Sequence, residues 1–177
     1  MQELEGLEPR FIEKVDLSDV LFTRLRPGED LFGRIKEICE ENDLKRAVIL
    51  ASIGSLTDVA FVNPKPGSTM PFDPSTMLGL QELPGPFELL TLEGTVFPLV
   101  GEFGDLKDGD PVIHLHAVLS SKTGEVTGGH MRKATVFTTV ELFLARIKGS
   151  KAVKKRSVVS ALTELRADIP ETPSAGS

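Results

Sequence analysis

The chain has 177 residues, a formal net charge of −6 and 40% hydrophobic residues, which fits one soluble domain with a tail. The acidic balance excludes a surface built throughout to attract phosphate backbones. No apolar run approaches the ~18–20 residues of a membrane span, and the acidic N-terminus lacks the order of a signal peptide. The single cysteine excludes an internal disulfide, so we expect a cytoplasmic protein.

The first predicted elements form a β-α-β unit that opens a single α/β (α+β) domain. A strand is expected at 22–25, and a turn containing Pro and Gly follows it. Asp30 is placed to cap a helix, in which apolar residues from Leu31 to Cys39 recur at intervals of three and four while charged residues take the other side. Residues 46–53 then indicate a largely buried strand.

The segment 63–86, in the middle of the chain, is rich in proline, and its six prolines are expected to interrupt any regular element. A segment of this length without structure is expected to be functional or to pack elsewhere, and it could form the wall of a ligand pocket. Four strand-like segments follow, at 87–97, 111–119, 126–132 and 134–147. We therefore expect a mainly antiparallel sheet with one principal helix packed on it.

The C-terminal part is predicted to lie outside the domain. Residues 148–156 are rich in Lys and Arg, which usually indicates a solvated tail and, as the alternative, contact with nucleic acid. A short helix is expected at 158–165, and the Pro/Thr/Ser/Gly composition of 169–177 predicts disorder. The predicted organisation is an N-terminal extension over 1–10, a domain over 11–147 and a tail over 148–177.

The three histidines of the chain all fall in one predicted β-hairpin. Alternation along the first strand puts His114 and His116 on one face and apolar residues on the other. A three-residue turn that pairs Ser121 with Glu125 sets His116 directly opposite His130. Three converging imidazoles with an open fourth position suit zinc best, or another divalent transition metal. The alternative is three ordinary surface histidines that lie close together.

Other polar residues are weaker candidates for this site. The same register puts Arg132 opposite His114, so we expect a bulge there or a guanidinium that turns away. Glu88 is either a general base or supporting group beside metal-bound water, or an edge or interface residue bound to amides or an arginine. Cys39 fits the core better than a fourth ligand position, and Glu141 is expected in an ion pair.

Several motifs in this chain resemble those of a known family. They are Arg26-Pro27-Gly28-Glu29-Asp30-Leu31, Ile53-Gly54-Ser55-Leu56, Gly85-Pro86-Phe87-Glu88-Leu89-Leu90, His114-Leu115-His116 and Gly128-Gly129-His130. In this order they resemble the plants-and-prokaryotes-conserved (PPC) domain over about residues 11–147. The resemblance implies a strongly bent sheet, a homotrimer and, as in similar bacterial and archaeal members, a metal bound at the histidine trio. Plant members carry AT-hooks and bind DNA, but this chain has no Arg-Gly-Arg-Pro hook, so a DNA-binding role rests on kinship alone.

These observations lead to one principal hypothesis and two alternatives. The principal one is a homotrimer whose tri-histidine metal binds a small ligand. The first alternative is a metal-dependent hydrolase or hydratase that uses metal-bound water, with Glu88 as the base. The second is a DNA-binding accessory protein that acts through residues 148–156. No nucleophile motif, phosphate loop or dinucleotide fingerprint names a substrate, so the sequence does not decide whether the protein is an enzyme.

Overall fold

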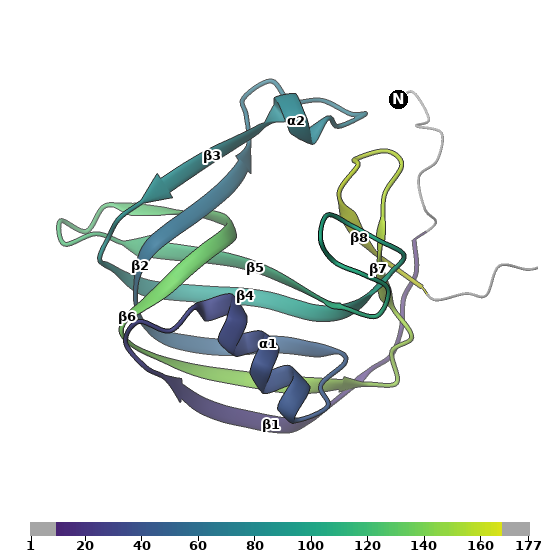
Figure 1. The fold of residues 1–177 in the computed structure, drawn as a ribbon, viewed down its shortest axis with the longest axis horizontal. Helices are drawn as coiled ribbons and strands as arrows, with labels where there is room; N and C mark the ends of the chain where they lie inside the picture. The colour runs from purple at the N-terminus through teal and green to yellow at the C-terminus, as the bar shows by residue number, and fades with distance from the viewer. Residues whose placement is uncertain (1–9, 168–177) are drawn as a thin grey trace, which may run out of the picture.

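A strongly bent sheet with one principal helix forms the body of the molecule (Figure 1), as the computed structural model shows for residues 10–167. The predicted α+β class and mainly antiparallel sheet are therefore confirmed. The elements are β1 (Asp16–Leu25), α1 (Leu31–Glu41), β2 (Ala47–Pro64), α2 (Pro74–Met77), β3 (Leu78–Leu83), β4 (Phe87–Val100), β5 (Pro111–Ser120), β6 (Val126–Lys148), β7 (Val153–Arg156) and β8 (Thr163–Arg166). Among residues 10–167, no helix combines the length and hydropathy needed to cross a bilayer.

Helix α1 begins at the predicted cap. The Asp30 carboxylate accepts a hydrogen bond from the Gly33 backbone N–H at 2.6 Å, which satisfies a donor of the first turn. Leu31, Ile35 and Cys39 are buried on the side of the helix that faces the sheet. The expectation that Cys39 is a core residue is therefore confirmed.

Four strands of the sheet form a closed circuit. β2 pairs with both β6 and β4, β6 pairs with β5, and β5 pairs with β4. β1 and β2 do not pair with each other in the opening β-α-β unit, because β6 lies between them. The long strands bend to close this circuit, and β2 and β6 approach very closely at Gly54, where an added Cβ would lie 2.8 Å from Val140 Cα.

The proline-rich segment is more regular than expected. It contains the short helix α2 and the strand β3, which pairs as a hairpin with the end of β2 from Val59 to Pro64. In Figure 1, α2 and the hairpin of β2 and β3 extend away from the rest of the sheet. The segment also contacts the C-terminal part of the chain, because the Phe72 backbone N–H donates a hydrogen bond to the Val159 carbonyl at 2.9 Å.

Two expectations for the C-terminal part are wrong. A turn and strand β8 occupy the region where a helix over 158–165 was predicted, since β8 pairs with β7 and β7 pairs in parallel with β4. The basic run is not a solvated tail throughout, because Val153 and Lys154 are buried against the sheet. Tertiary pairing overrides the local preference of such a short segment. The predicted disorder of 169–177 concerns residues outside the described part of the chain.

Candidate metal centre

The hairpin of β5 and β6 has the predicted register. The Ser121 backbone N–H donates to the Glu125 carbonyl at 2.9 Å, and His116 lies directly opposite His130. The alternate residues of β5, including Leu115 and Leu119, are buried in the core on the other face. Two strands of a single hairpin therefore supply all three histidines.

The expected conflict between Arg132 and His114 does not arise. Pairing between β5 and β6 ends at Leu115 and Met131, beyond which β6 pairs with β2 instead. His114 lies opposite Thr95 of β4, and Arg132 is exposed. Arg132 is therefore not paired with His114, although its charge still acts on His130.

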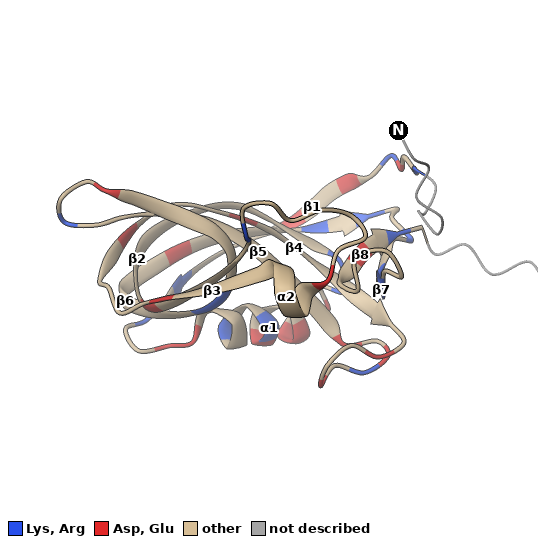
Figure 2. Ribbon diagram, turned by 90° about the horizontal axis from the view of Figure 1, so that it is seen from above, with Lys and Arg blue, Asp and Glu red and all other residues tan. Residues whose placement is uncertain are grey.

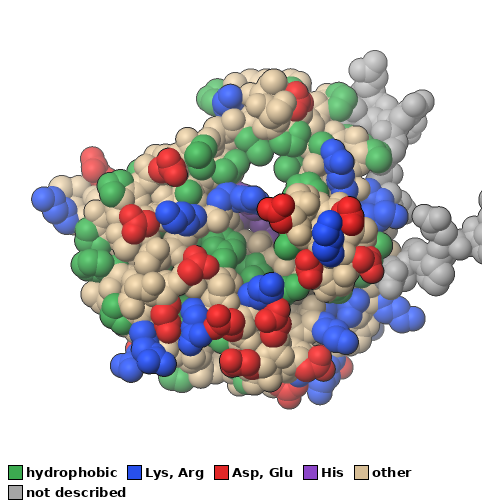
Figure 3. All heavy atoms as spheres, viewed as in Figure 1, with side chains coloured by type: hydrophobic (Ala, Val, Ile, Leu, Met, Phe, Trp, Pro, Cys, Tyr) green, Lys and Arg blue, Asp and Glu red, His purple; other side chains and the backbone are tan. Residues whose placement is uncertain are grey.

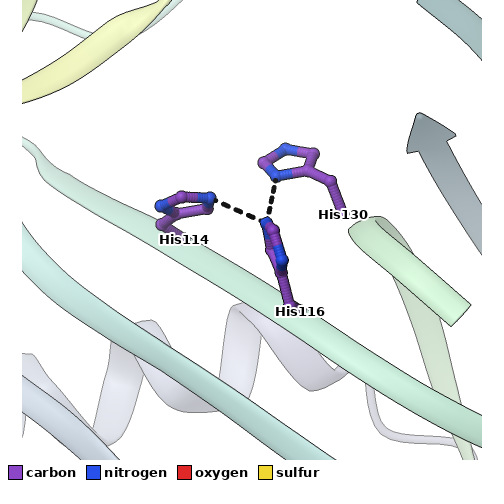
Figure 4. A group of neighbouring side chains, drawn as sticks. All are labelled: His114, His116 and His130. Carbon is purple, nitrogen blue, oxygen red and sulfur yellow. Dashed lines mark hydrogen bonds between the residues drawn. The ribbon is translucent and has the colours of Figure 1, made fainter. Parts of the chain in front are cut away.

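The three imidazole rings converge, as Figure 4 shows. His114 Nε2 lies 3.2 Å from His116 Nε2, and His130 Nδ1 lies 3.4 Å from the same His116 atom. One nitrogen from each ring falls in a group whose members all lie within 4.8 Å of one another. Tetrahedral zinc with Zn–N bonds of about 2.0–2.1 Å requires ligand nitrogens about 3.3–3.4 Å apart. Two of the three separations already match this spacing, so the donor set fits such an ion.

Burial keeps the His114 and His130 rings neutral. It lowers the pKa of His114 to about 4, with a further contribution from the nearby Lys154 ammonium. Burial is also the main reason that the pKa of His130 is lowered to about 4, followed by the effects of His116 and Arg132. A neutral imidazole offers the lone pair that a metal requires, whereas an imidazolium does not. Near pH 7 these two rings are therefore in the ligating form.

Asn63 holds the backbone of the third histidine in place. Its Oδ1 accepts a hydrogen bond from the His130 N–H at 3.1 Å, and its Nδ2 donates to the Gly128 carbonyl at 3.1 Å. Gly129 lies between these two points with φ of +144°, and any Cβ there would overlap the Asn63 amide. Asn63 was not predicted from the sequence, because the contact joins β6 to the end of a strand 67 positions away.

An open hollow of about 510 Å³ adjoins His114 and His116. Figure 3 shows histidine in the depth of a hollow on the face it displays. The lining residues come from β2, β4 and β5, and not from the proline-rich segment that was expected to form the wall; they are Val48, Ile49, Leu50, Glu93, Gly94, Thr95, His114 and His116.

The carboxylates predicted near the site are placed differently. The register sets Glu93, which sequence reasoning missed, opposite His116, whereas Glu88 lies exposed opposite Ser120 near the other end of β4. Glu88 is therefore not brought to the histidine group. Glu141 is exposed opposite Arg24 of β1, and its ion pair stays a prediction.

A buried lysine also lies beside the site. Lys154 of β7 is only 6% exposed, and its Nζ lies 3.5 Å from His114 Nδ1. Burial lowers the pKa of Lys154, while the nearby Glu164 acts in the opposite direction. No local pattern could reveal this placement, because it depends on the pairing of β7 with β4.

Comparison with known proteins adds relatives of this fold. A protein from Pyrococcus horikoshii described as a plant- and prokaryote-conserved protein is 26% identical, with a TM-score of 0.69, over 88% of this chain and 97% of its own. A metal-containing protein from Archaeoglobus fulgidus is 26% identical, with a TM-score of 0.70, over 89% of this chain and 99% of its own. A protein from Ralstonia eutropha, provisionally described as DNA-binding, is 16% identical, with a TM-score of 0.65, over 82% of this chain and 89% of its own. At that identity the likeness shows the fold alone.

The sequence comparisons identify the family. The bifunctional protein GlmU of a Synechococcus strain is 28% identical over 123 residues, but this chain spans only 16% of its length. A family model described as the Plants and Prokaryotes Conserved (PCC) domain matches residues 13–148. That match covers most of the chain, and the bent sheet agrees with the solved structures of this kind. The chain therefore belongs to the Plants and Prokaryotes Conserved domain family.

Proposed function

We propose that this protein binds a transition metal ion, zinc in preference, through His114, His116 and His130, and that the ion's open position binds a small ligand. The proposal depends chiefly on the nitrogen separations of 3.2 and 3.4 Å, which suit a tetrahedral ion. The similar protein from Archaeoglobus fulgidus is described as metal-containing, which supports the same role here. The hollow beside His114 and His116 would give a ligand access to the site.

Metal content tests this proposal directly. Protein purified without a histidine tag should contain about one equivalent of metal per chain by elemental mass spectrometry. The His114→Ala/His116→Ala variant should lose it, whereas Lys122→Ala, at the exposed tip of the same hairpin, should keep it. Equal metal in the double variant and the wild type, with both folded by circular dichroism, would refute the site.

A metal-dependent hydrolase or hydratase is the second candidate for the same centre. A zinc ion held by three imidazoles supplies a Lewis acid that can acidify water. Glu93, opposite His116, is placed better than Glu88 to accept a proton there. Hydrolysis of esters, amides or phosphoesters that is lost in Glu93→Gln and kept in Glu88→Gln would support this reaction class. Activity that is indifferent to a chelator would count against it.

A homotrimer is the proposed assembly, as the family resemblance implies. Exposed apolar residues on neighbouring strands supply a surface that a partner could cover. Phe22 and Phe143 stack with ring centroids 4.5 Å apart, and Phe22 remains 60% exposed. Ile53, on the adjacent strand β2, is 69% exposed. Sedimentation equilibrium should give three times the chain mass for the wild type and a smaller species for Ile53→Glu. A monomeric wild type would contradict the proposal.

A DNA-binding role for the basic run has weaker support. Lys154 is buried, which leaves Lys148, Lys151 and Arg156 as its exposed cations. Basic and acidic residues are interspersed along the chain in Figure 2. A salt-dependent shift of duplex DNA that disappears when these three residues are changed to alanine would support this role. Substitution is preferable to truncation after 147, which would remove the paired strands β7 and β8.

A further inference from the structure

Two rows of side chains cross the sheet beside the metal centre. Residues that lie directly opposite each other on neighbouring strands share a face of the sheet. The first row runs over β2, β4 and β5 as Val48, Thr95 and His114. In the second row, Glu93 lies opposite His116. The side chains of both rows line the hollow, so a molecule in the hollow would contact the proposed metal ligands together with their neighbours.

Leu50 completes the second row. It follows Ile49, which lies opposite Gly94, and strand alternation therefore puts Leu50 on the same face as Glu93. Its side chain is 45% exposed and lines the hollow. Neighbouring strands are about 4.8 Å apart. Each row therefore presents a histidine, a polar side chain one strand away and an apolar side chain two strands away.

The acidic side chain of this lining is Glu93. In the part of the chain that the structure describes, its carboxylate has no hydrogen-bonding or ion-pair partner. A carboxylate only accepts hydrogen bonds, so a ligand beside it would have to offer a donor. A positively charged donor suits it best, because a charge-assisted hydrogen bond is stronger than a neutral one.

The proposed ion and Glu93 favour opposite charges on a ligand. The ion is a dication, which binds an oxygen that carries negative charge, whereas the Glu93 carboxylate favours positive charge beside it. A simple carboxylate at the ion would lie near the like charge of Glu93, and a simple ammonium beside Glu93 would lie near the dication. A molecule that carries a carboxylate and an ammonium on neighbouring atoms satisfies both groups.

We propose that the ligand of the metal centre is an α-amino acid with a short aliphatic side chain. Its carboxylate binds the open position of the ion, and its α-ammonium donates to Glu93, with the Thr95 hydroxyl as a second acceptor. Its side chain packs on Leu50 and Val48, one strand beyond these polar groups. This inference rests on the proposed metal site, and it adds the class of ligand and a residue that recognises it.

Cobalt-loaded protein provides the test, because the visible absorption of Co²⁺ changes when its ligands change. In the wild type, 2-aminopentanoate should change the spectrum saturably, with an apparent Kd at least tenfold below that of pentanoate, which lacks the amino group. In Glu93→Gln the Kd for 2-aminopentanoate should rise at least tenfold, while the Kd for pentanoate should not rise. Glu88→Gln, an exposed position of the same strand opposite Ser120, should bind both acids like the wild type.

The apolar part of the hollow has its own comparison. Free alanine has a shorter side chain than 2-aminopentanoate, so it should bind the wild type several-fold more weakly. Leu50→Ala should reduce this difference, because it removes apolar surface from the hollow. An unchanged difference in Leu50→Ala would show that the aliphatic side chain does not lie on this wall, and would overturn that part of the assignment.

The contrary outcomes distinguish the metal site from its ligand. Failure of the wild type to bind cobalt would overturn the metal site and this inference together. Normal cobalt binding with equal Kd values for the two acids, or with no change of the 2-aminopentanoate Kd in Glu93→Gln, would overturn this inference alone. A changed cobalt content or spectrum in Glu93→Gln without any added acid would show that Glu93 binds the ion itself, which would also overturn it.

Discussion

Substitution of Gly129 by alanine tests how the third histidine is held in place. At this position a Cβ would lie 2.5 Å from Asn63 Cγ and closer still to both amide heteroatoms, so the Asn63 side chain must move away. It then loses its hydrogen bonds to the His130 N–H and the Gly128 carbonyl. The backbone φ of +144° also disfavours alanine.

The expected loss of stability is the sum of these effects. Two hydrogen bonds contribute roughly 1 kcal/mol each, and a positive φ costs a residue with a Cβ about 1–2 kcal/mol. The free energy of unfolding should therefore fall by about 3–4 kcal/mol. Gly124 also has a positive φ, of +81°, but nothing lies within 4 Å of an added Cβ. Gly124→Ala should lose only the backbone contribution, about 1–2 kcal/mol.

Urea unfolding of the metal-free variants measures this difference. Gly129→Ala should be about 2 kcal/mol less stable than Gly124→Ala, since it alone breaks the two Asn63 hydrogen bonds. Because His130 shifts with its backbone, zinc affinity should fall at least tenfold in Gly129→Ala and stay unchanged in Gly124→Ala. If the two variants lose the same stability, Asn63 does not hold this strand, and the reasoning is refuted.

Acidification should destabilise the metal-free protein, because burial lowers the pKa of both His114 and His130 from 6.5 to about 4. The unfolded chain then binds more protons between these values, so the free energy of unfolding is at its full value above pH 6.5 and falls toward pH 4, by up to about 3 kcal/mol for each of the two histidines. Urea unfolding at several pH values should show a smaller loss in His114→Gln/His130→Gln, and an equal loss would contradict the reasoning. Cys39 is 3% exposed and burial raises the pKa of its thiol to about 11, so a thiol reagent should modify it only in denaturant; rapid labelling of the native protein would count against this placement.

The histidine hairpin could be predicted because its determinants are local. Strand alternation fixes the shared face of His114 and His116, and the turn between Ser121 and Glu125 fixes the partner of His116. The alternation and the turn each lie within a few residues of the histidines whose positions they predict. In the same way, Asp30 lies directly before the helix that it caps.

The residues that surround the hairpin could not be found in this way. Lys154 and His114 are 40 positions apart, and Asn63 and His130 are 67 apart. Their contacts follow from the path of the bent sheet and from the parallel pairing of β7 with β4, for which the sequence has no local pattern. The same pairing explains why the cationic run resembled a tail. The apolar neighbours of Glu88 make it the more conspicuous carboxylate in the sequence, but only the register of β4 with β5 shows that Glu93 lies opposite a histidine.

The chain between Asn63 and Phe72 is attached to other parts of the molecule at both ends. At one end, the Asn63 side chain accepts a hydrogen bond from the backbone of His130 in β6. At the other end, the Phe72 backbone N–H donates to the Val159 carbonyl, in the turn between β7 and β8. Lys154 belongs to β7. Exposed loops usually tolerate insertions, but extra residues here would alter the spacing between His130, a proposed metal ligand, and Lys154. Homologues that share this site should therefore vary less in length along this excursion than in the loop between β4 and β5.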